Sequence, residues 1–184
     1  MYQLKVTLRG SRPAIWRRVT VSSEVTLYEL HRILQVVMGW MDSHPHEFER
    51  GRTLYGQSDP EFGVRRISER KIRLQDVLRK PRDRMRYQYD FGDSWEHDVL
   101  LEAVLPAGTE AQPPRVLDGK GACPPEDVGG IWGYAEFLEA IRDPQHPEHQ
   151  SMLDWCGGAF DPDAFDAAEI NLVLARRGRR KARR

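Results

Sequence analysis

The sequence has few cysteines, no long apolar run and no net charge, and each shortage excludes a class of protein. Its 28 basic and 28 acidic residues give a formal net charge of zero. The two cysteines, Cys123 and Cys156, lack the spacing of a metal knuckle or a redox motif, so we expect no disulfide. No segment approaches the roughly 20 apolar residues that span a bilayer. We therefore expect a soluble, cytoplasmic protein with no membrane partner.

The length of 184 residues fits one domain that buries most of its apolar surface without disulfide staples. We expect this domain to cover residues 1–175. The remaining residues, 176–184, consist of seven arginines and lysines with one glycine and one alanine. Such a segment buries too little apolar area to offset the entropy of ordering, so we expect a disordered basic tail.

The zero net charge conceals an acidic body, because residues 87–175 carry eighteen acids against three basic side chains. One interpretation of the basic tail is a nucleic-acid arm, since lysine and arginine release counterions from phosphate. The other is a solubilising segment that folds back onto the acidic body. We expect any nucleic-acid binding through the tail to be weak and non-specific, because the sequence offers no groove-reading element.

Hydrophobic periodicity in the first quarter of the chain predicts a strand pair followed by a helix. Apolar and polar residues alternate over residues 4–8 and again over residues 15–21, as in strands with one buried face. Thr26 and Glu29 have the spacing of a capping box, and Gly39 supplies a left-handed helix end. The sequence therefore predicts a helix between them.

The rest of the chain completes the α+β pattern, a mixed or antiparallel sheet covered by helices on one face. Residues 85–91 and 95–105 are predicted to form a β-hairpin. Residues 106–130 are rich in proline and glycine and predict a long loop, a kind of segment that is usually functional or disordered. Beyond it we expect a helical C-terminal third, whose last helix has Asp161 as its N-cap and Pro162 at its first position.

The predicted hairpin crowds acids and a histidine among aromatic rings, and this favours a site. His44 and His46 point to the same face if they lie on a strand. Together with Asp93 and His97 they offer nitrogen and oxygen ligands that suit zinc or another divalent transition metal. The alternative is that the first two histidines cap a loop and that Asp93 forms an Asx-turn.

A binding cleft between the hairpin and the long loop is the second hypothesis. Asp90 and Trp95 of the hairpin would face Cys123, Glu126 and Asp127 of the loop. Both segments hold polar groups at tight turns that need partners, so we expect them to adjoin. The cysteine is expected to be structural, because the two loop acids would raise the pKa of its thiol.

Five ordered segments resemble one known family and cover nearly the whole chain, from residue 2 to residue 175. They are Arg12–Arg18, Met38–Trp40 with His44 and His46, Tyr89–His97, Ala122–Gly130 with Gly133 and Tyr134, and Phe160–Pro162 with Phe165 and Asp166. They resemble the Ri-plasmid open-reading-frame-three-like family, whose members also occur as insertion-sequence passenger proteins under the resolvase-like label TnpR. The resemblance implies a single α+β domain and an association with mobile elements, and it implies no established activity.

The sequence thus favours a non-catalytic binding or accessory module linked to mobile elements. The alternative is a metal-dependent enzyme that uses His44, His46, Asp93 and His97. The choice depends on whether the protein binds a metal ion.

Overall fold

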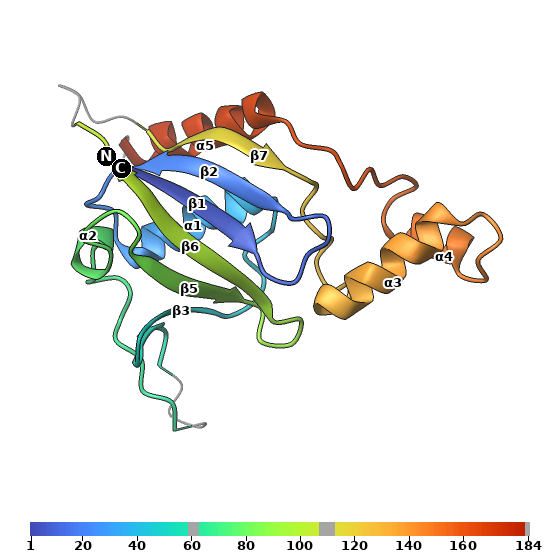
Figure 1. The fold of residues 1–184 in the computed structure, drawn as a ribbon, viewed down its shortest axis with the longest axis horizontal. Helices are drawn as coiled ribbons and strands as arrows, with labels where there is room; N and C mark the ends of the chain where they lie inside the picture. Colours follow the sequence, from blue (N-terminus) through green and yellow to red (C-terminus); the bar gives the residue numbers. More distant parts are fainter. Residues whose placement is uncertain (59–62, 107–112, 183–184) are drawn as a thin grey trace.

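A computed structural model describes residues 1–58, 63–106 and 113–182 (Figure 1). Its described part contains one seven-stranded antiparallel sheet with the order β4-β3-β5-β6-β1-β2-β7. The strands are β1 (Tyr2–Leu8), β2 (Trp16–Val21), β3 (His46–Arg50), β4 (Thr53–Gly56), β5 (Arg84–Tyr89), β6 (Trp95–Val104) and β7 (Arg115–Lys120). The helices are α1 (Leu27–Met38), α2 (Leu74–Val77), α3 (Gly130–Arg142), α4 (His149–Trp155) and α5 (Ala167–Ala182). The predicted α+β class fits this arrangement.

The sheet has one buried face and one solvated face. Burial alternates along β1 and β2, so that Leu4 and Val6 are fully buried on the face covered by α1. On the opposite face, Arg18 pairs with Glu102 of β6 at 2.6 Å. This ion pair spans the intervening strand β1 on the open face, and the core lies on the helical side.

Helix α1 begins and ends where the sequence predicts. The Thr26 hydroxyl accepts a hydrogen bond from the Glu29 N–H, and the Glu29 carboxylate accepts one from the Thr26 N–H. Gly39 takes the left-handed conformation at φ 91°, and its N–H donates to the Gln35 carbonyl. Both helix ends are thereby satisfied, which fixes where the chain leaves α1 toward β3.

Arg17 carries a buried charge that joins three elements. The residue is 3% exposed, and its guanidinium donates to the carbonyls of Val37, Trp16, Lys120 and Gly121 at 2.8–3.2 Å. None of the carboxylates in the described part of the chain forms an ion pair with it. The Val37 carbonyl belongs to the last turn of α1, whose negative dipole end stabilises the cation. Burial lowers the pKa of Arg17, but an arginine remains charged.

The predicted loop over residues 106–130 contains a strand. β7 pairs antiparallel with β2 at one edge of the sheet. Of its side chains only Val116 is buried, so the strand has no hydrophobic alternation that the sequence could reveal. Asn171 of α5 accepts from the Val116 N–H and donates to its carbonyl, and thus covers the exposed edge.

The last helix begins later than the sequence predicts. Asp161 and Pro162 lie in a turn, and α5 starts at Ala167. The Asp166 carboxylate accepts a hydrogen bond from the Ala168 N–H at 2.7 Å, so the cap is Asp166, five residues beyond the predicted one. The acidic, loop-forming sequence offers several possible caps, and packing of the helix on β7 selects between them.

The C-terminal segment also differs from expectation. α5 continues through residues 176–182, where the sequence predicts a disordered tail; arginine, lysine and alanine are good helix formers once a preceding turn is packed. Residues 183–184 lie outside the described part. A helical C-terminal third is not confirmed, because loops over residues 143–148 and 156–166 separate α3, α4 and α5.

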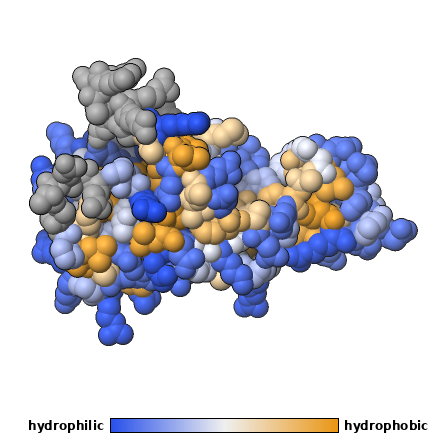
Figure 2. Space-filling model, turned by 90° about the horizontal axis from the view of Figure 1, so that it is seen from above, coloured by the Kyte–Doolittle hydropathy of each residue, from blue (hydrophilic) through white to orange (hydrophobic). Residues whose placement is uncertain are grey.

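Helices α3 and α4 pack against each other and project to one side of the sheet (Figure 1). Trp132 of α3 is 82% exposed and Trp155 of α4 is 49% exposed. Figure 2 shows a hydrophobic area on this projecting lobe. Within the described ranges, no helix has the length and apolar character needed to cross a membrane.

We predict that Arg17→Met lowers the free energy of unfolding by at least about 3 kcal/mol, because it leaves buried carbonyls without donors. Arg18→Met is the matched control on the solvated face and should cost less than about 1 kcal/mol. Urea denaturation of both variants measures the difference. Equal costs would show that the buried guanidinium contributes no more than its exposed neighbour.

Candidate functional site

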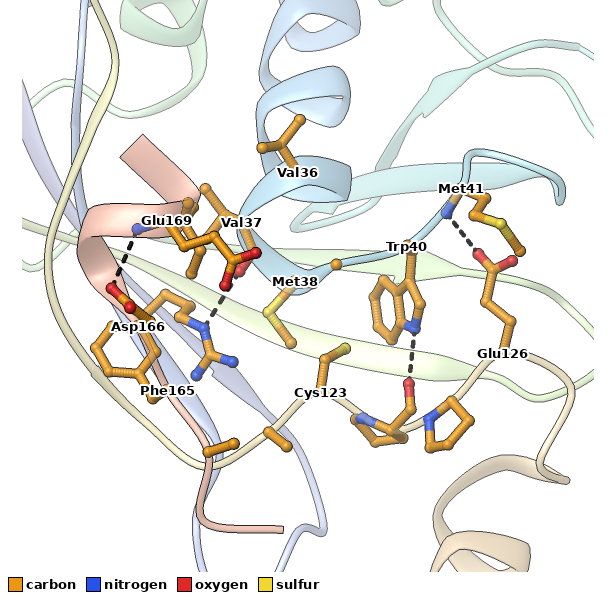
Figure 3. Close-up of a pocket in the computed structure, with 17 residues that line it drawn as sticks. Val36, Val37, Met38, Trp40, Met41, Cys123, Glu126, Phe165, Asp166 and Glu169 are labelled. Carbon is orange, nitrogen blue, oxygen red and sulfur yellow. Dashed lines mark hydrogen bonds between the residues drawn. The ribbon is translucent and has the colours of Figure 1, made fainter. Parts of the chain in front are cut away.

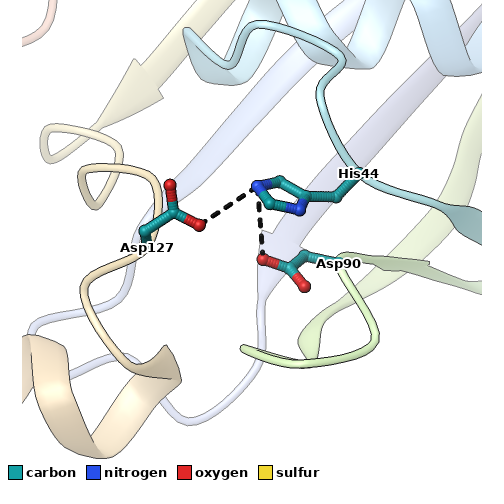
Figure 4. Close-up of side chains that lie close together, drawn as sticks. All are labelled: His44, Asp90 and Asp127. Carbon is teal, nitrogen blue, oxygen red and sulfur yellow. Dashed lines mark ion pairs between the residues drawn. The ribbon is translucent and has the colours of Figure 1, made fainter.

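Three connections that are distant in sequence meet at one end of the sheet. They are the link between α1 and β3, the hairpin turn between β5 and β6, and the loop before α3. Their side chains His44, Asp90 and Asp127 point toward one another (Figure 4). His44 Nε2 lies 3.1 Å from Asp127 Oδ1 and 3.8 Å from Asp90 Oδ2, and the three ligand atoms lie within 4.8 Å of one another.

The hairpin turn fixes Asp90 in place. The residue has a left-handed backbone at φ 58°, and its N–H donates to the Pro45 carbonyl at 2.8 Å. Its Oδ1 accepts from the N–H groups of Gly92 and Asp93, so the Asx-turn proposed for Asp93 belongs to Asp90 instead. Oδ2 remains directed at His44, and the side chain is 9% exposed. The result is a largely buried carboxylate with one oriented oxygen.

Asp93 holds the long loop against the hairpin. Its Oδ2 accepts a hydrogen bond from the Gly129 N–H at 3.1 Å. A side chain at Gly130 would collide with the Asp93 carbonyl oxygen, so this close approach requires glycine. The predicted adjacency of the hairpin and the loop is confirmed by these contacts. Whether the two segments form a functional site stays a prediction.

Glu126 fastens the same loop to the core. Its Oε1 accepts hydrogen bonds from the Tyr89 hydroxyl at 2.7 Å and from the Met41 N–H at 2.9 Å. Trp40 Nε1 donates to the Pro124 carbonyl at 3.1 Å. Burial, and then the bond to Glu126, raises the pKa of Tyr89, so its hydroxyl stays a donor. The loop that carries Asp127 is therefore held from two sides.

The four residues predicted as metal ligands do not converge. Only His44 joins the cluster, because β3 begins at His46 and the two histidines do not share a strand face. His46 Nε2 lies 2.8 Å from Glu69 Oε2. Asp93 holds the loop, and His97 is fully buried in the core. Two residues predicted for the cleft, Asp90 and Asp127, lie beside His44 instead.

Two other residues predicted for the cleft, Trp95 and Cys123, pack in or against the hydrophobic core. Trp95 is 1% exposed and packs against Trp40 with ring centroids 5.9 Å apart. Burial raises the pKa of the Cys123 thiol, with a smaller contribution from Glu126, while Arg17 opposes the change. The prediction that this thiol is not a nucleophile therefore agrees with its surroundings, although burial rather than acidic neighbours is the main cause.

A cavity of about 520 Å³ lies between the end of α1, the loop around Cys123 and the start of α5 (Figure 3). Val36, Met38 and Trp40 give it apolar walls, and Glu126 lies at one side. Arg17, Glu126 and Asp166 also line it, but each is bound to backbone groups, Arg17 to carbonyls and the two acids to N–H groups. We therefore place the candidate site at the cluster around His44.

His44 also lines a groove of about 1140 Å³ whose walls carry histidines and carboxylates. His46 stacks on His31 of α1 with ring centroids 3.4 Å apart and an interplanar angle of 1°. His31 Nε2 lies 2.7 Å from Asp42 Oδ1, and its Nδ1 lies 2.8 Å from the Tyr87 hydroxyl. Burial, followed by the neighbouring His46, lowers the pKa of His31 to about 4, so this ring is neutral at pH 7.

Nothing in the sequence pattern predicts a role for His31 at a site. The residue lies in the apolar stripe of α1 between Leu27, Leu30 and Leu34, all of them fully buried. A histidine within such a stripe is the only signal available, and it indicates a polar partner from another element. That partner is Asp42, eleven residues away, and the contact depends on how the chain turns after Gly39.

Comparison with known proteins places this fold and its loops in a family. The sequence profile of the family described as "Plasmid pRiA4b ORF-3-like protein" matches residues 1–169. The chain belongs to this family. It is 43% identical over 188 residues to the "Uncharacterized protein y4hQ" of Sinorhizobium fredii (strain NBRC 101917 / NGR234), covering 99% of this chain and 96% of that protein.

A solved structure confirms the fold of the plasmid pRiA4b ORF-3-like chain. The structure of this chain resembles the crystal structure of the protein of unknown function MM3350 from Methanosarcina mazei Go1, with a TM-score of 0.82 and 38% identity. The match covers 91% of this chain and 96% of that one. The predicted plasmid family is thus confirmed, whereas these names do not support the insertion-sequence label TnpR.

We predict that acid destabilises the protein through its buried histidines. Burial lowers the pKa values of His31 and His97 to about 4, below the ordinary value of 6.5. Between pH 6.5 and about pH 4 these two histidines are protonated in the unfolded chain but remain neutral in the folded protein. The free energy of unfolding therefore has its full value above pH 6.5 and decreases as the pH falls toward about 4. Each histidine lowers the free energy of unfolding by roughly 1.4 kcal/mol per pH unit in this window.

The variant His97→Phe tests this, since it keeps a ring in the core and removes one titrating group. Urea denaturation between pH 6.5 and pH 4 should show wild type losing stability faster than the variant. A stability difference that does not change with pH would contradict the assignment.

Proposed function

We propose that this plasmid pRiA4b ORF-3-like protein is a metal-dependent binding module, in which His44, Asp90 and Asp127 hold a divalent transition-metal ion. One observation carries the proposal: three loops distant in sequence bring an imidazole nitrogen and two carboxylate oxygens within 4.8 Å of one another. Exposed acids often gather without an ion, but here one carboxylate is largely buried and oriented by its own turn.

The spacing of the donor atoms fits a small cation. Bonds of about 2.0–2.1 Å in tetrahedral geometry place ligand atoms roughly 3.3 Å apart, close to the 3.1 Å and 3.8 Å separations at His44 Nε2. This Nε2 is buried and, despite its ion-pair distance to Asp127, makes no hydrogen bond of good geometry with the described residues. An imidazole with two carboxylates suits zinc, manganese or iron.

Charge supports the same conclusion. Within the described chain, Asp90 and Asp127 have ion-pair contacts only with His44, so two carboxylates share one histidine. A divalent ion would relieve their repulsion. Asp127 is 69% exposed, and three protein ligands leave coordination positions open to the solvent side. An ion held in this way would bind a ligand rather than serve only as a structural clasp.

The wider role follows the family and remains part of the proposal. A cytoplasmic accessory function linked to plasmids or insertion sequences rests on the resemblance of the sequence. Weak, non-specific nucleic-acid binding by residues 176–184 rests on their charge.

A metal-dependent enzyme is the second candidate, and one observation favours it. The His46–Glu69 pair lines the same groove as His44. An imidazole that is oriented by a carboxylate can act as a general base, and the carboxylate then stabilises the imidazolium; such a pair could take the proton of a water held by the proposed ion. If this candidate holds, Mn²⁺-loaded protein hydrolyses a phosphate or carboxylate ester, and Glu69→Gln abolishes the activity while keeping Mn²⁺ affinity. Equal activity in this variant would exclude that role for the pair.

We predict that the purified protein binds one Mn²⁺ or Zn²⁺ ion per chain in calorimetric titration. His44→Ala and Asp90→Asn should each weaken the affinity by at least about tenfold, because each removes a ligand atom. His46→Gln is the matched control and should keep the affinity, since its imidazole pairs with Glu69. No binding by wild type, or loss of binding in the control alone, would overturn the proposed ligand set.

A further inference from the structure

The groove beside the proposed metal site is lined by different kinds of side chain at its two ends. The positions of these side chains along the groove follow from the contacts and sequence neighbours of its residues. His44 lies two residues before His46, which pairs with Glu69 at 2.8 Å. Glu69 precedes Arg70, whose guanidinium lies 3.9 Å above the ring of Tyr28. The groove therefore includes His44, one of the proposed metal ligands, then the His46–Glu69 pair, and then an arginine that lies over an aromatic ring.

The far end offers a flat cationic platform. Arg70 has no ion pair with the carboxylates of the described residues, so stacking on Tyr28 is its main contact. A guanidinium on a phenol ring is planar and weakly hydrated, and it favours a second aromatic ring of a ligand. This end thus suits a base rather than an aliphatic chain.

The middle of the groove suits hydroxyl groups. Asp42 uses Oδ1 for His31, and Glu69 uses Oε2 for His46. The second oxygen of each carboxylate makes no hydrogen bond to a residue in the described ranges, and such oxygens accept hydrogen bonds from sugar hydroxyls. An anionic group would be repelled here, whereas a neutral ribose would be held.

We propose that the groove takes a nucleotide, with its phosphate on the metal ion, its ribose hydroxyls at Asp42 and Glu69, and its base on the Tyr28–Arg70 platform. The volume of about 1140 Å³ gives room for a whole mononucleotide with water. This inference rests on the proposed function, because the metal ion supplies the contact to phosphate.

The negative charge of the groove means that phosphate can bind there only when the metal ion is present. Asp42, Glu69 and Asp90 are negative at this end of the sheet, and Arg66 already pairs with Glu47 at 2.7 Å. Without a divalent ion these carboxylates repel phosphate. With the ion bound, its charge compensates the two aspartates of the cluster and leaves a local site for an anion.

The test is calorimetric titration of Mn²⁺-loaded protein with adenosine 5′-monophosphate. Adenosine and inorganic phosphate should each bind at least about tenfold more weakly, since each lacks one of the end contacts. The metal-free protein should not bind the nucleotide or inorganic phosphate, whereas the weak binding of adenosine should be the same with and without Mn²⁺, because adenosine has no group on the ion. Binding of the nucleotide without Mn²⁺ would overturn the proposal.

Substitutions at the Tyr28–Arg70 platform test where the base of the nucleotide binds. Arg70→Gln and Tyr28→Leu should weaken nucleotide binding by about tenfold through loss of stacking, while Mn²⁺ affinity stays unchanged and shows that the variants fold. Arg65→Gln is the matched control from the same basic segment, because Arg65 does not line the groove.

The remaining outcomes are distinct. Normal Mn²⁺ binding without nucleotide binding, or equal nucleotide binding by all variants, would overturn the inference and leave the metal site intact. Tighter binding of a twelve-residue oligothymidylate than of the mononucleotide would assign the groove to single-stranded nucleic acid and also overturn it. Absence of Mn²⁺ binding is measured first and would refute the proposed function itself.

Discussion

The buried guanidinium of Arg17 is the contact on which the rest of the structure depends. It joins β2 to the last turn of α1 and to the end of β7 through four backbone carbonyls. These contacts fix where the chain leaves α1 and where it leaves β7, the two points from which His44 and Asp127 are reached. A buried charge is stable only when its donors are satisfied, so the three elements are constrained to one arrangement.

Turns rather than regular elements position the candidate site. Asp90 and Asp127 both have left-handed backbones, at φ 58° and 60°, and Gly130 allows the loop to touch Asp93. Such conformations are costly for residues other than glycine and persist where surrounding contacts hold them. The hydrogen bonds of Glu126 to Tyr89 and of Asp93 to the loop supply those contacts. A rigid sheet thus presents ligand atoms on loops that have little freedom to move apart.

Two buried histidines near the candidate site make the free energy of unfolding depend on pH. His31 and His97 stay neutral in the folded protein because burial disfavours their charged forms. Metal ligands must also be deprotonated to bind an ion. Acid therefore weakens the fold and the proposed metal site together, and neutral conditions favour both.

The sequence by itself determines the elements whose signals are local. The capping box at Thr26, the left-handed end at Gly39 and the alternation along β1 each involve residues no more than a few positions apart, and the structure places all three as predicted. The family resemblance adds the class of fold. Only the tertiary structure decides that β7 is a strand, since its evidence is pairing with β2 and Asn171 rather than a pattern of its own.

The same distinction applies to the site. The sequence indicates the right neighbourhood, the hairpin and the long loop, but it assigns ligands by a two-residue spacing that requires a strand at His44. The strand begins at His46, and the side chains that lie beside His44 are instead Asp90 and Asp127, the latter 83 residues further along the chain. Contacts over such separations depend on how buried faces pack and how turns are held, and no local pattern records them.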